Sequence, residues 1–546
     1  MGRRTPRRLL VVVATTALLT AACTGSDSGS STDSGDDGSG APSGGSFSIA
    51  LGSDPSFLAP TAQCYESTCS QVLSMLYTGL LSIDPETSEQ VLGDAESIES
   101  SDSKVWTVKL KPDLKFHNGE PVDAEAYVRA WNYSAYGPNA TQTGFFFSPV
   151  EGYADLQAPA SGGQPKAQEM SGLKVIDDQT IEITLSEAFS QWSLVMSYTP
   201  AFAPLSKECE QDIEACNEQP IGTGPYMMAQ PWQHNKLITL TKWDDYTGPN
   251  SANADEIEVK LYSDPKTAFR DWQADQVDML DTVDPSQVPQ AQQLAGERFL
   301  SVDSGSFNYL GIPFYVEELQ DADIRRALSM AIDRQTIVDQ VLNGLATPAF
   351  DVVAPFVTGS REDACEYCSY DPEAAKTLYD EAGGIEDGVI EIWFNNDGGH
   401  EDWVQAVAEG WKNVLGVDYE LQSQPFTPYL KTLEEEGIGG PYRLGWIPDY
   451  PSAENYLDPV YGEGSSNYGQ WAGPEHEAFL DKIAEADAAP TSEAVTIYQE
   501  AADIVLEELP VLPLWYGRTS IVYAENLDNV TYDPLQQIKL GDITVS

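Results

Sequence analysis

Histidine is scarce in this sequence, and the motifs of common enzyme classes are missing. The four histidines, His117, His234, His400 and His476, lie far apart in a chain of 546 residues. No Gly-x-Ser-x-Gly elbow, Gly-Lys-Ser/Thr phosphate loop, dinucleotide Gly-x-Gly-x-x-Gly or His-Glu-x-x-His zinc motif occurs. We therefore predict that the protein is not an enzyme, with no catalytic residues, no metal site and no cofactor.

Basic residues are also few, because 29 Lys and Arg stand against 86 Asp and Glu. Nucleic-acid binding depends on clustered basic side chains that release counterions, so we expect no nucleic-acid partner. The acidity fits a well-solvated exterior surface. The length exceeds what one hydrophobic core usually serves and indicates about three domain-sized units.

The N-terminus has an apolar stretch, Leu9 to Leu19, that is too short to span a bilayer. Arginines precede it and the small residues Thr20 to Ala22 follow it, so residues 1–22 are typical of an export signal. The following Cys23 resembles a bacterial lipobox cysteine, although Thr20 stands where Leu is usual. The resemblance implies that Cys23 carries a lipid and begins the mature protein; ordinary secretion is the alternative. Residues 23–46 are then a disordered Gly/Ser/Asp tether.

The remaining six cysteines fall into three close pairs. An even number in an exported chain indicates disulfides, and proximity favours local pairing. A redox or metal role for the Cys-x-x-Cys pair is the less favoured alternative. The expected pairs are Cys64 with Cys69, Cys209 with Cys216, and Cys365 with Cys368.

Strand and helix patterns alternate along the rest of the chain. Val105 to Leu110 alternates like a strand, and we expect Asp323 to open an amphipathic helix. Ile390 to Leu421 has the pattern of a βαβ unit. Residues 137–172 read as loops, in which we expect the triplet Phe145 to Phe147 to serve packing. The prediction is an α/β protein with mixed sheets.

Asp449 lies alone among apolar and aromatic residues, between Trp446 and Tyr450. If the segment is buried, something must compensate this charge, and a ligand cation is one candidate. A solvated Asp in a Pro-bounded loop is the alternative.

Several stretches, in order from about Phe47 to the C-terminus, resemble the peptide/nickel class of extracytoplasmic solute-binding proteins of ABC importers. They are Leu76 to Leu80, Leu114 to Val122, Gly222 to Tyr226, Asp323 to Arg334 and Gly445 to Tyr450. After the last stretch, Pro451 to Glu454 replaces the Asp-Pro often found in the family.

The resemblance implies a periplasmic-binding-protein-like clamp of two lobes with an inserted subdomain. His117 and the Gly222 to Tyr226 segment would be structural, and chain crossings near Ser306 and Tyr516 would form the hinge. Carried onto this chain, lobe I takes residues 47–82, 196–308 and 519–546, the insertion takes 83–195, and lobe II takes 309–518.

The resemblance also implies what is bound. Asp449 would pair with a peptide's α-ammonium, Trp446 and Tyr450 would line the cleft, and Arg443 would lie near the ligand. The protein would be a monomer, held by its lipid on the outer face of the cell membrane, that delivers oligopeptides or dipeptides to permease subunits. Oligosaccharides, nickel complexes or haem are alternative ligands, and a secreted hydrolase is a more distant alternative.

Overall fold

The computed structural model describes residues 44–52, 54–59, 67–84, 90–159, 162–396, 399–463, 466–533, 535 and 537–546. Within these residues the largest sheet has eleven strands, ten of them in the order β15-β14-β16-β12-β17-β11-β1-β10-β9-β8, while β13 pairs with β17. Parallel and antiparallel neighbours both occur, as in β1 with β10 and β9 with β10. The predicted α/β class with mixed sheets is therefore confirmed.

One half of this sheet, with its helices, forms lobe I. Apolar residues alternate along its strands, as in β10, where Ile257 and Val259 are fully buried. Its strands are β1 (Ser46–Leu51), β8 (Tyr226–Met228), β9 (Leu237–Lys242), β10 (Glu256–Leu261) and β11 (Met279–Leu280). Its helices include α1 (Ser67–Leu76), α5 (Lys207–Gln211), α6 (Ile213–Glu218), α7 (Pro265–Gln273) and α8 (Val288–Ala295). Short C-terminal ribbons, β18 (Leu527–Asp528) with β21 (Thr544–Val545) and β19 (Tyr532–Asp533) with β20 (Gln537–Ile538), complete it.

The other half forms lobe II, where the predicted βαβ unit is confirmed. In parallel register, Ile392 of β14 lies opposite Leu421 of β15, and α12 connects the two strands. The strands are β13 (Ala346–Pro348), β14 (Val389–Asn395), β15 (Asp418–Gln424) and β16 (Tyr442–Trp446). The helices are α9 (Ala322–Met330), α10 (Arg334–Gln340), α11 (Pro372–Glu381), α12 (Glu401–Leu415), α13 (Phe426–Glu434), α14 (Glu454–Tyr461), α15 (Pro474–Ala488) and α16 (Thr491–Glu508).

The inserted part has its own sheet of four strands within the described residues. Its order is β4 (Ala95–Ser100), β5 (Val105–Leu110), β7 (Thr180–Thr184) and β6 (Leu173–Asp177). Helix α2 (Ala124–Ala135) begins after Asp123, whose carboxylate accepts from the Ala126 N–H at 2.8 Å. Short elements flank it: β2 (Leu81–Ile83), β3 (Gln90–Leu92), α3 (Trp192–Val195) and α4 (Thr199–Phe202). The loops expected in residues 137–172 contain three short 3-10 helices, at Gly137–Asn139, Gly144–Phe147 and Tyr153–Leu156.

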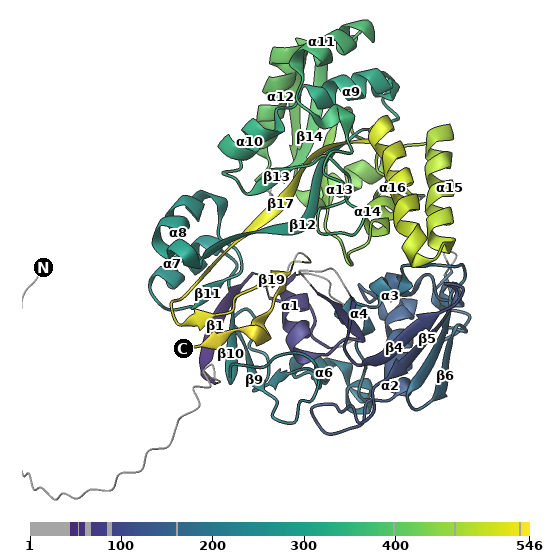
Figure 1. The fold of residues 1–546 in the computed structure, drawn as a ribbon, viewed down its shortest axis with the longest axis vertical. Coiled ribbons are helices and arrows are strands. Elements are labelled where there is room, and N and C mark those ends of the chain that lie inside the picture. The colour runs from purple at the N-terminus through teal and green to yellow at the C-terminus, as the bar shows by residue number, and fades with distance from the viewer. Residues whose placement is uncertain are drawn as a thin grey trace, which may run out of the picture. The chain divides into compact units, whose positions relative to one another are not determined.

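Two long strands run through both lobes side by side. β12 (Phe299–Gly311) and β17 (Val511–Tyr523) pair antiparallel along most of their length (Figure 1). β17 pairs with β11 of lobe I through Tyr523, whereas β12 pairs with β16 of lobe II through Phe307. Their register shifts between Asp303 and Phe307. A bend in both strands at this irregularity would move one lobe relative to the other.

Two of the three predicted disulfides are present. Cys209 pairs with Cys216, and Cys365 pairs with Cys368, with Cα–Cα distances of 5.1 and 5.4 Å. Cys64 lies outside the described residues, so its pairing with Cys69 stays a prediction. The export signal, Cys23 and nearly all of the tether also lie outside them. Among the described helices, none is long and apolar enough to cross a membrane.

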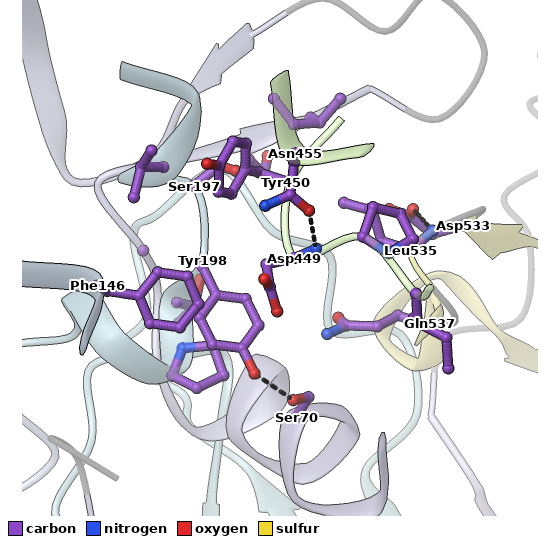
Figure 2. A pocket seen from close by; sticks show the side chains of 18 of the residues that line it. Ser70, Phe146, Ser197, Tyr198, Asp449, Tyr450, Asn455, Asp533, Leu535 and Gln537 are labelled. Atoms are coloured by element: carbon purple, nitrogen blue, oxygen red, sulfur yellow. Dashed lines mark hydrogen bonds between the residues drawn. The ribbon is translucent and has the colours of Figure 1, made fainter. Parts of the chain in front are cut away.

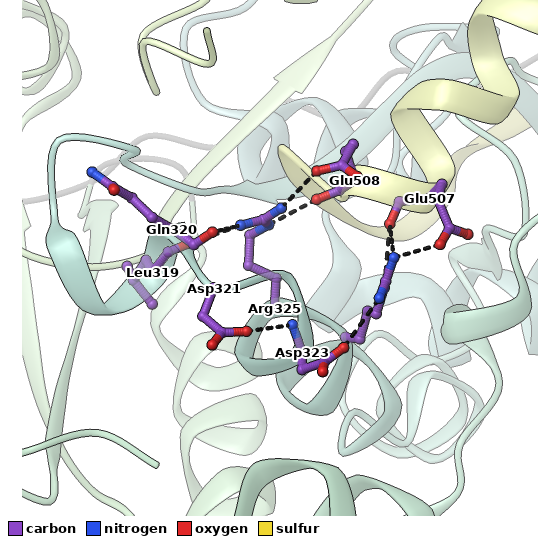
Figure 3. Close-up of polar contacts among 8 residues, drawn as sticks. Leu319, Gln320, Asp321, Asp323, Arg325, Glu507 and Glu508 are labelled. Carbon is purple, nitrogen blue, oxygen red and sulfur yellow. Dashed lines mark hydrogen bonds and ion pairs between the residues drawn. The ribbon is translucent and has the colours of Figure 1, made fainter. Parts of the chain in front are cut away.

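The Asp323 to Arg334 stretch packs lobe II internally, and Figure 3 shows its contacts around Arg325. The Arg325 guanidinium, 1% exposed, donates at 2.7 Å from Nε to the Glu508 carbonyl oxygen and at 3.2 Å from Nη2 to the Glu508 carboxylate. Its Nη1 also reaches the carbonyl oxygens of Leu319 and Gln320 at 3.1 and 2.7 Å. These bonds fix the end of α16 against the start of α9. The expected helix start at Asp323 was wrong by one residue, because α9 begins at Ala322 and the capping side chain is Asp321.

Candidate functional site

A cavity of about 1560 Å³ lies between the lobes. Lobe I contributes the end of α1 and the C-terminal ribbons, and the insertion contributes residues around Phe146 and Phe189. Lobe II contributes α14 and the segment that follows β16. The cavity is therefore bounded by all three parts of the fold.

Asp449 lies in this cavity, and its carboxylate has no basic partner among the described residues. Its backbone N–H donates to Asn455 Oδ1 at 2.9 Å, which fixes the loop on α14. Figure 2 shows the Asp449 side chain pointing into the space between Tyr198 and Gln537. Burial raises the pKa of Asp449 to about 6, and a hydrogen bond with Asn455 opposes the shift. An incoming cation would relieve this cost of burial.

The structure brings Trp446 and Tyr450 together with Asp449, but not Arg443. Trp446 lines the cavity, half-buried, and its indole N–H donates to Asn455 Oδ1 at 3.4 Å. Tyr450 also lines the cavity and is 6% exposed. Arg443 lies apart from the described cavity lining.

Arg443 points to the other face of its strand. Successive side chains of a strand alternate between faces, so residues 443 and 446 of β16 lie on opposite sides. The Arg443 guanidinium donates to Asn395 Oδ1 at 3.2 Å and to Asn308 Oδ1 at 3.5 Å, on the neighbouring strands β14 and β12. In this conformation Arg443 supports the sheet under the cavity.

Among the carboxylates that line the cavity, three lie close to Asp449 on α14 and α15: Glu454, Asp458 and Asp487, which we call the acid cluster. Tyr450 Oη donates to Glu454 Oε2 at 2.6 Å. Burial, followed by the charges of the other carboxylates, raises the pKa of Glu454 well above its usual value. The sequence analysis missed this cluster.

An aromatic wall lies in the insertion and the adjoining part of lobe I. The rings of Phe145 and Phe146 stack with centroids 4.3 Å apart, and Phe146 stacks on Tyr198 at 4.8 Å. All three residues line the cavity, and Phe145 is 51% exposed. Phe146 and Phe147 are both buried in the core, as expected for packing, whereas Phe145 is exposed to the cavity. The cavity thus combines an acidic side and an aromatic side.

The family model for bacterial extracellular solute-binding proteins, family 5 (middle region), matches residues 90–468, more than half of the chain. The chain belongs to this family. Its members are binding proteins rather than enzymes, so this chain is an extracytoplasmic solute-binding protein.

Curated relatives of this family 5 protein cover most of its length. The oligopeptide-binding protein OppA of Bacillus subtilis (strain 168) is 26% identical over 488 residues, which cover 85% of this chain and 86% of the relative. The probable deoxycholate-binding periplasmic protein YgiS of Escherichia coli (strain K12) is 28% identical over 483 residues, again 85% and 86%.

Solved structures confirm the fold. The unliganded open form of the murein tripeptide-binding protein MppA superposes with a TM-score of 0.78 at 19% identity, covering 93% of this chain and 99% of that one. Haemophilus influenzae OppA in complex with RPPGFSPFR gives a TM-score of 0.71 at 21% identity, covering 93% and 100%. The two-lobe clamp expected for a family 5 protein is therefore present.

The Leu114 to Val122 and Gly222 to Tyr226 segments of this family 5 protein contact each other through His117, whereas Tyr77, Thr78 and Gly79 of the Leu76 to Leu80 segment line the cavity. The His117 ring accepts from the Gly222 N–H at 3.1 Å through Nδ1, and its Nε2 lies 3.1 Å from the Gly224 carbonyl oxygen. Burial lowers the pKa of His117 to about 4, so the ring is neutral at physiological pH. The expected role in turns and packing is confirmed.

Proposed function

We propose that this protein captures peptides in the cavity between its lobes and delivers them to an ABC importer. The observation that carries the proposal is Asp449, a carboxylate in the cavity without a basic partner among the described residues. A peptide's α-ammonium supplies the missing positive charge and up to three hydrogen-bond donors. Trp446 and Tyr450 would contact the first residues of the ligand.

The size of the cavity supports a peptide of several residues. Small-molecule sites usually measure about 300–1,000 Å³, and this cavity of about 1560 Å³ exceeds that range. The names of relatives such as OppA of Bacillus subtilis point to the same class of ligand. Extended peptides can bond through their backbones while water fills the side-chain pockets, so a wide range of sequences would fit.

The other ligand classes fit the lining less well. No histidine occurs among the described lining residues, so the lining offers no imidazole for haem or nickel. Its aromatic side could stack on a sugar, but a neutral sugar would leave the charge of Asp449 without a partner. A bile acid such as that in the name of YgiS is an anion, and the acidic side of the cavity would repel it. A peptide remains the ligand that this chemistry favours.

The location and the organisation of the chain complete the proposal. Cys23 would carry the lipid that holds a monomeric protein at the cell membrane, and the tether to residue 46 would let the body turn. The lobes would divide as the family resemblance implies, with 83–195 inserted into lobe I and 309–518 forming lobe II. Closure around the ligand would bend the chain near Ser306 and Tyr516.

Calorimetry on a short peptide and its N-acetylated form tests the role of Asp449. If Asp449 holds the α-ammonium, removing either charge leaves the other unpaired, which costs roughly 2 to 5 kcal/mol. We therefore expect acetylation or Asp449→Asn each to weaken binding at least about tenfold. Acetylation should have little further effect in the variant, because the pair is already broken.

Asp481→Asn is the matched control, because Asp481 is an exposed carboxylate of α15 that does not line the cavity. This variant should bind both peptides like the wild type. Equal binding of both peptides by the wild type and by Asp449→Asn would remove Asp449 from the site. A broad peptide library in which nothing binds would overturn peptide capture itself.

A further inference from the structure

The acid cluster lies beside Asp449 without any counter-charge. Glu454 and Asp458 are one helical turn apart on α14, so they share a face of the helix. Asp487 lies at the end of α15, which contacts α14. The whole chain is acidic, so the number of carboxylates in the cavity carries little information. Glu454 is buried, Asp487 is half-buried and Asp458 is exposed, and none of the three has a basic partner among the described residues. A buried carboxylate without a cation, as Glu454 is, does carry information, because carboxylates are seldom buried unpaired.

Glu454 is the most deeply buried member, with an exposed fraction of 6%. Tyr450 Oη donates to its Oε2, and no other side-chain donor or cation reaches this carboxylate among the described residues. Its other oxygen, Oε1, therefore lacks a partner within a cavity that Glu454 lines. An ionised carboxylate in this position is unfavourable until a cation arrives.

Asp458 and Asp487, the other two members of the acid cluster, also have few hydrogen-bond donors and no cation beside them among the described residues. Asp487 accepts from Tyr498 Oη at 2.5 Å, whereas Asp458 has no side-chain hydrogen bond or ion pair among the described residues. Burial raises the pKa of both groups, that of Asp487 to about 7. At Asp487 the like charge of Asp458 adds to this cost, and a cation placed among the acids would reduce it.

The geometry favours an organic cation over a metal ion. Among the described residues, no three His, Cys, Asp or Glu side chains converge closely enough to hold a metal. The protein supplies no cation either, because Lys539, the single basic residue of the described lining, pairs with Asp533 at 3.0 Å. A flexible ammonium or guanidinium from the ligand could bond to several spaced carboxylates in turn.

We propose that Glu454, Asp458 and Asp487 form a second cation subsite, which takes the side chain of a Lys or Arg near the N-terminus of a bound peptide. This inference rests on the proposed function, because Asp449 must hold the α-ammonium first. The protein would then prefer peptides with two positive charges close together. Glu454 and Asp487, already oriented by tyrosine hydroxyls, would receive the cation, and Asp458 would add its charge from the more exposed side.

The test compares peptides that differ only in this second charge. Three tripeptides carry Lys at position 1, 2 or 3 with Ala elsewhere, and each has a partner with norleucine at the same position. Norleucine keeps the aliphatic chain and lacks the ammonium group, so the pair isolates the charge. Calorimetry at constant ionic strength is run on wild type, Asp458→Asn, Asp487→Asn and the control Asp481→Asn.

We expect at least one Lys peptide to bind the wild type at least about tenfold more tightly than its norleucine partner. Asp458→Asn or Asp487→Asn should reduce that ratio at least about threefold with little change for the norleucine peptide, while the control keeps the ratio. Circular dichroism and thermal melting check that each variant is folded.

The outcomes separate the two proposals. Norleucine peptides that bind as tightly as Lys peptides at all three positions would overturn the second subsite and leave peptide capture intact. A Lys preference that both cluster variants retain would place the subsite elsewhere and overturn this assignment. Failure of every peptide to bind would overturn both proposals.

Discussion

Gly517 of β17 lies directly against the Ser306 hydroxyl of β12, so a Cβ atom at position 517 would overlap that oxygen. The same Cβ would lie 2.9 Å from Ser304 Oγ, and the two serine hydroxyls are themselves 2.9 Å apart. This contact occurs where the two strands that join the lobes lose their register, between Asp303 and Phe307. The absence of a side chain at 517 lets the strands approach closely at the crossing.

Gly517→Ala should therefore destabilise the protein by about 1 to 3 kcal/mol, the usual cost of overpacking. In a Ser306→Ala background the cost should be smaller, because the closest atom has been removed. Urea unfolding of the four proteins in this double-mutant cycle measures the coupling. Strictly additive effects would contradict a direct contact between the two positions.

The affinity of the protein for a peptide whose side chains carry no charge should fall as the pH is lowered. Asp449, with a pKa of about 6 in the unliganded protein, loses most of its negative charge when pH is lowered from about 7.5 to about 5. The peptide's α-amino group, with a pKa of about 8, becomes more protonated over this range and slightly opposes the fall, so the loss of about tenfold comes from the carboxylate. Titration calorimetry across this range checks it, and Asp449→Asn should flatten the dependence.

The stability of the unliganded protein should respond to pH through Asp487. Its folded-state pKa of about 7 is above the ordinary value of about 3.9, so the folded state binds more protons between these limits. The contribution that this raised pKa makes to the free energy of unfolding is fully present below about pH 4 and is lost as pH rises through about 7. The free energy of unfolding of Asp487→Asn minus that of the wild type should therefore be larger at about pH 8 than at about pH 5. Urea unfolding of both proteins at both pH values measures this difference. An equal difference at both pH values would contradict the raised pKa.

Arg325→Met should destabilise lobe II by about 2 to 4 kcal/mol. The change leaves the Glu508 carboxylate and three buried or partly buried carbonyl oxygens without their donor. Breaking a buried pair costs about 3 to 5 kcal/mol, and Glu508 at 23% exposure keeps some contact with solvent. Lys376→Met is the control, because its exposed pair with Asp380 should contribute less than about 1 kcal/mol. Equal effects in chemical unfolding would contradict the role of Arg325.

Cys23→Ser should release the protein from the membrane into the medium. The change removes the sulfur that would carry the diacylglyceryl group and leaves the export signal in place. Cell fractionation followed by immunoblotting measures the distribution. A variant that stays with the membrane fraction would show that some other part of the chain anchors it.

Regular patterns made much of the fold predictable. The βαβ unit in Ile390 to Leu421 could be predicted because buried strands and an amphipathic helix each have their own period. The start of α9 was harder to predict, since Asp321 and Asp323 are both good capping residues and only Ala322 lies between them. The pairing of β12 with β17 brings together segments about two hundred residues apart in sequence. Only the family resemblance predicted that the chain passes between the lobes at these two places.

The site was predictable to a smaller degree. Asp449 stood out because it lies alone between aromatic residues, whereas Glu454, Asp458 and Asp487 are three among 86 acids. Their common position depends on the packing of α15 against α14, which no local pattern encodes. Arg443 was assigned by resemblance alone; strand alternation, applied to residues 443 and 446, would have separated it from the cleft.

Both described disulfides close very short loops, since their cysteines are 7 and 3 positions apart in sequence. Neither of these two bridges connects one lobe with the other. Reduction would loosen each loop locally but would not change how the lobes are joined, because the paired strands β12 and β17, where we propose the hinge, connect them. Ligand uptake should therefore proceed alike in oxidising and reducing surroundings, provided that the local loops hold their shape.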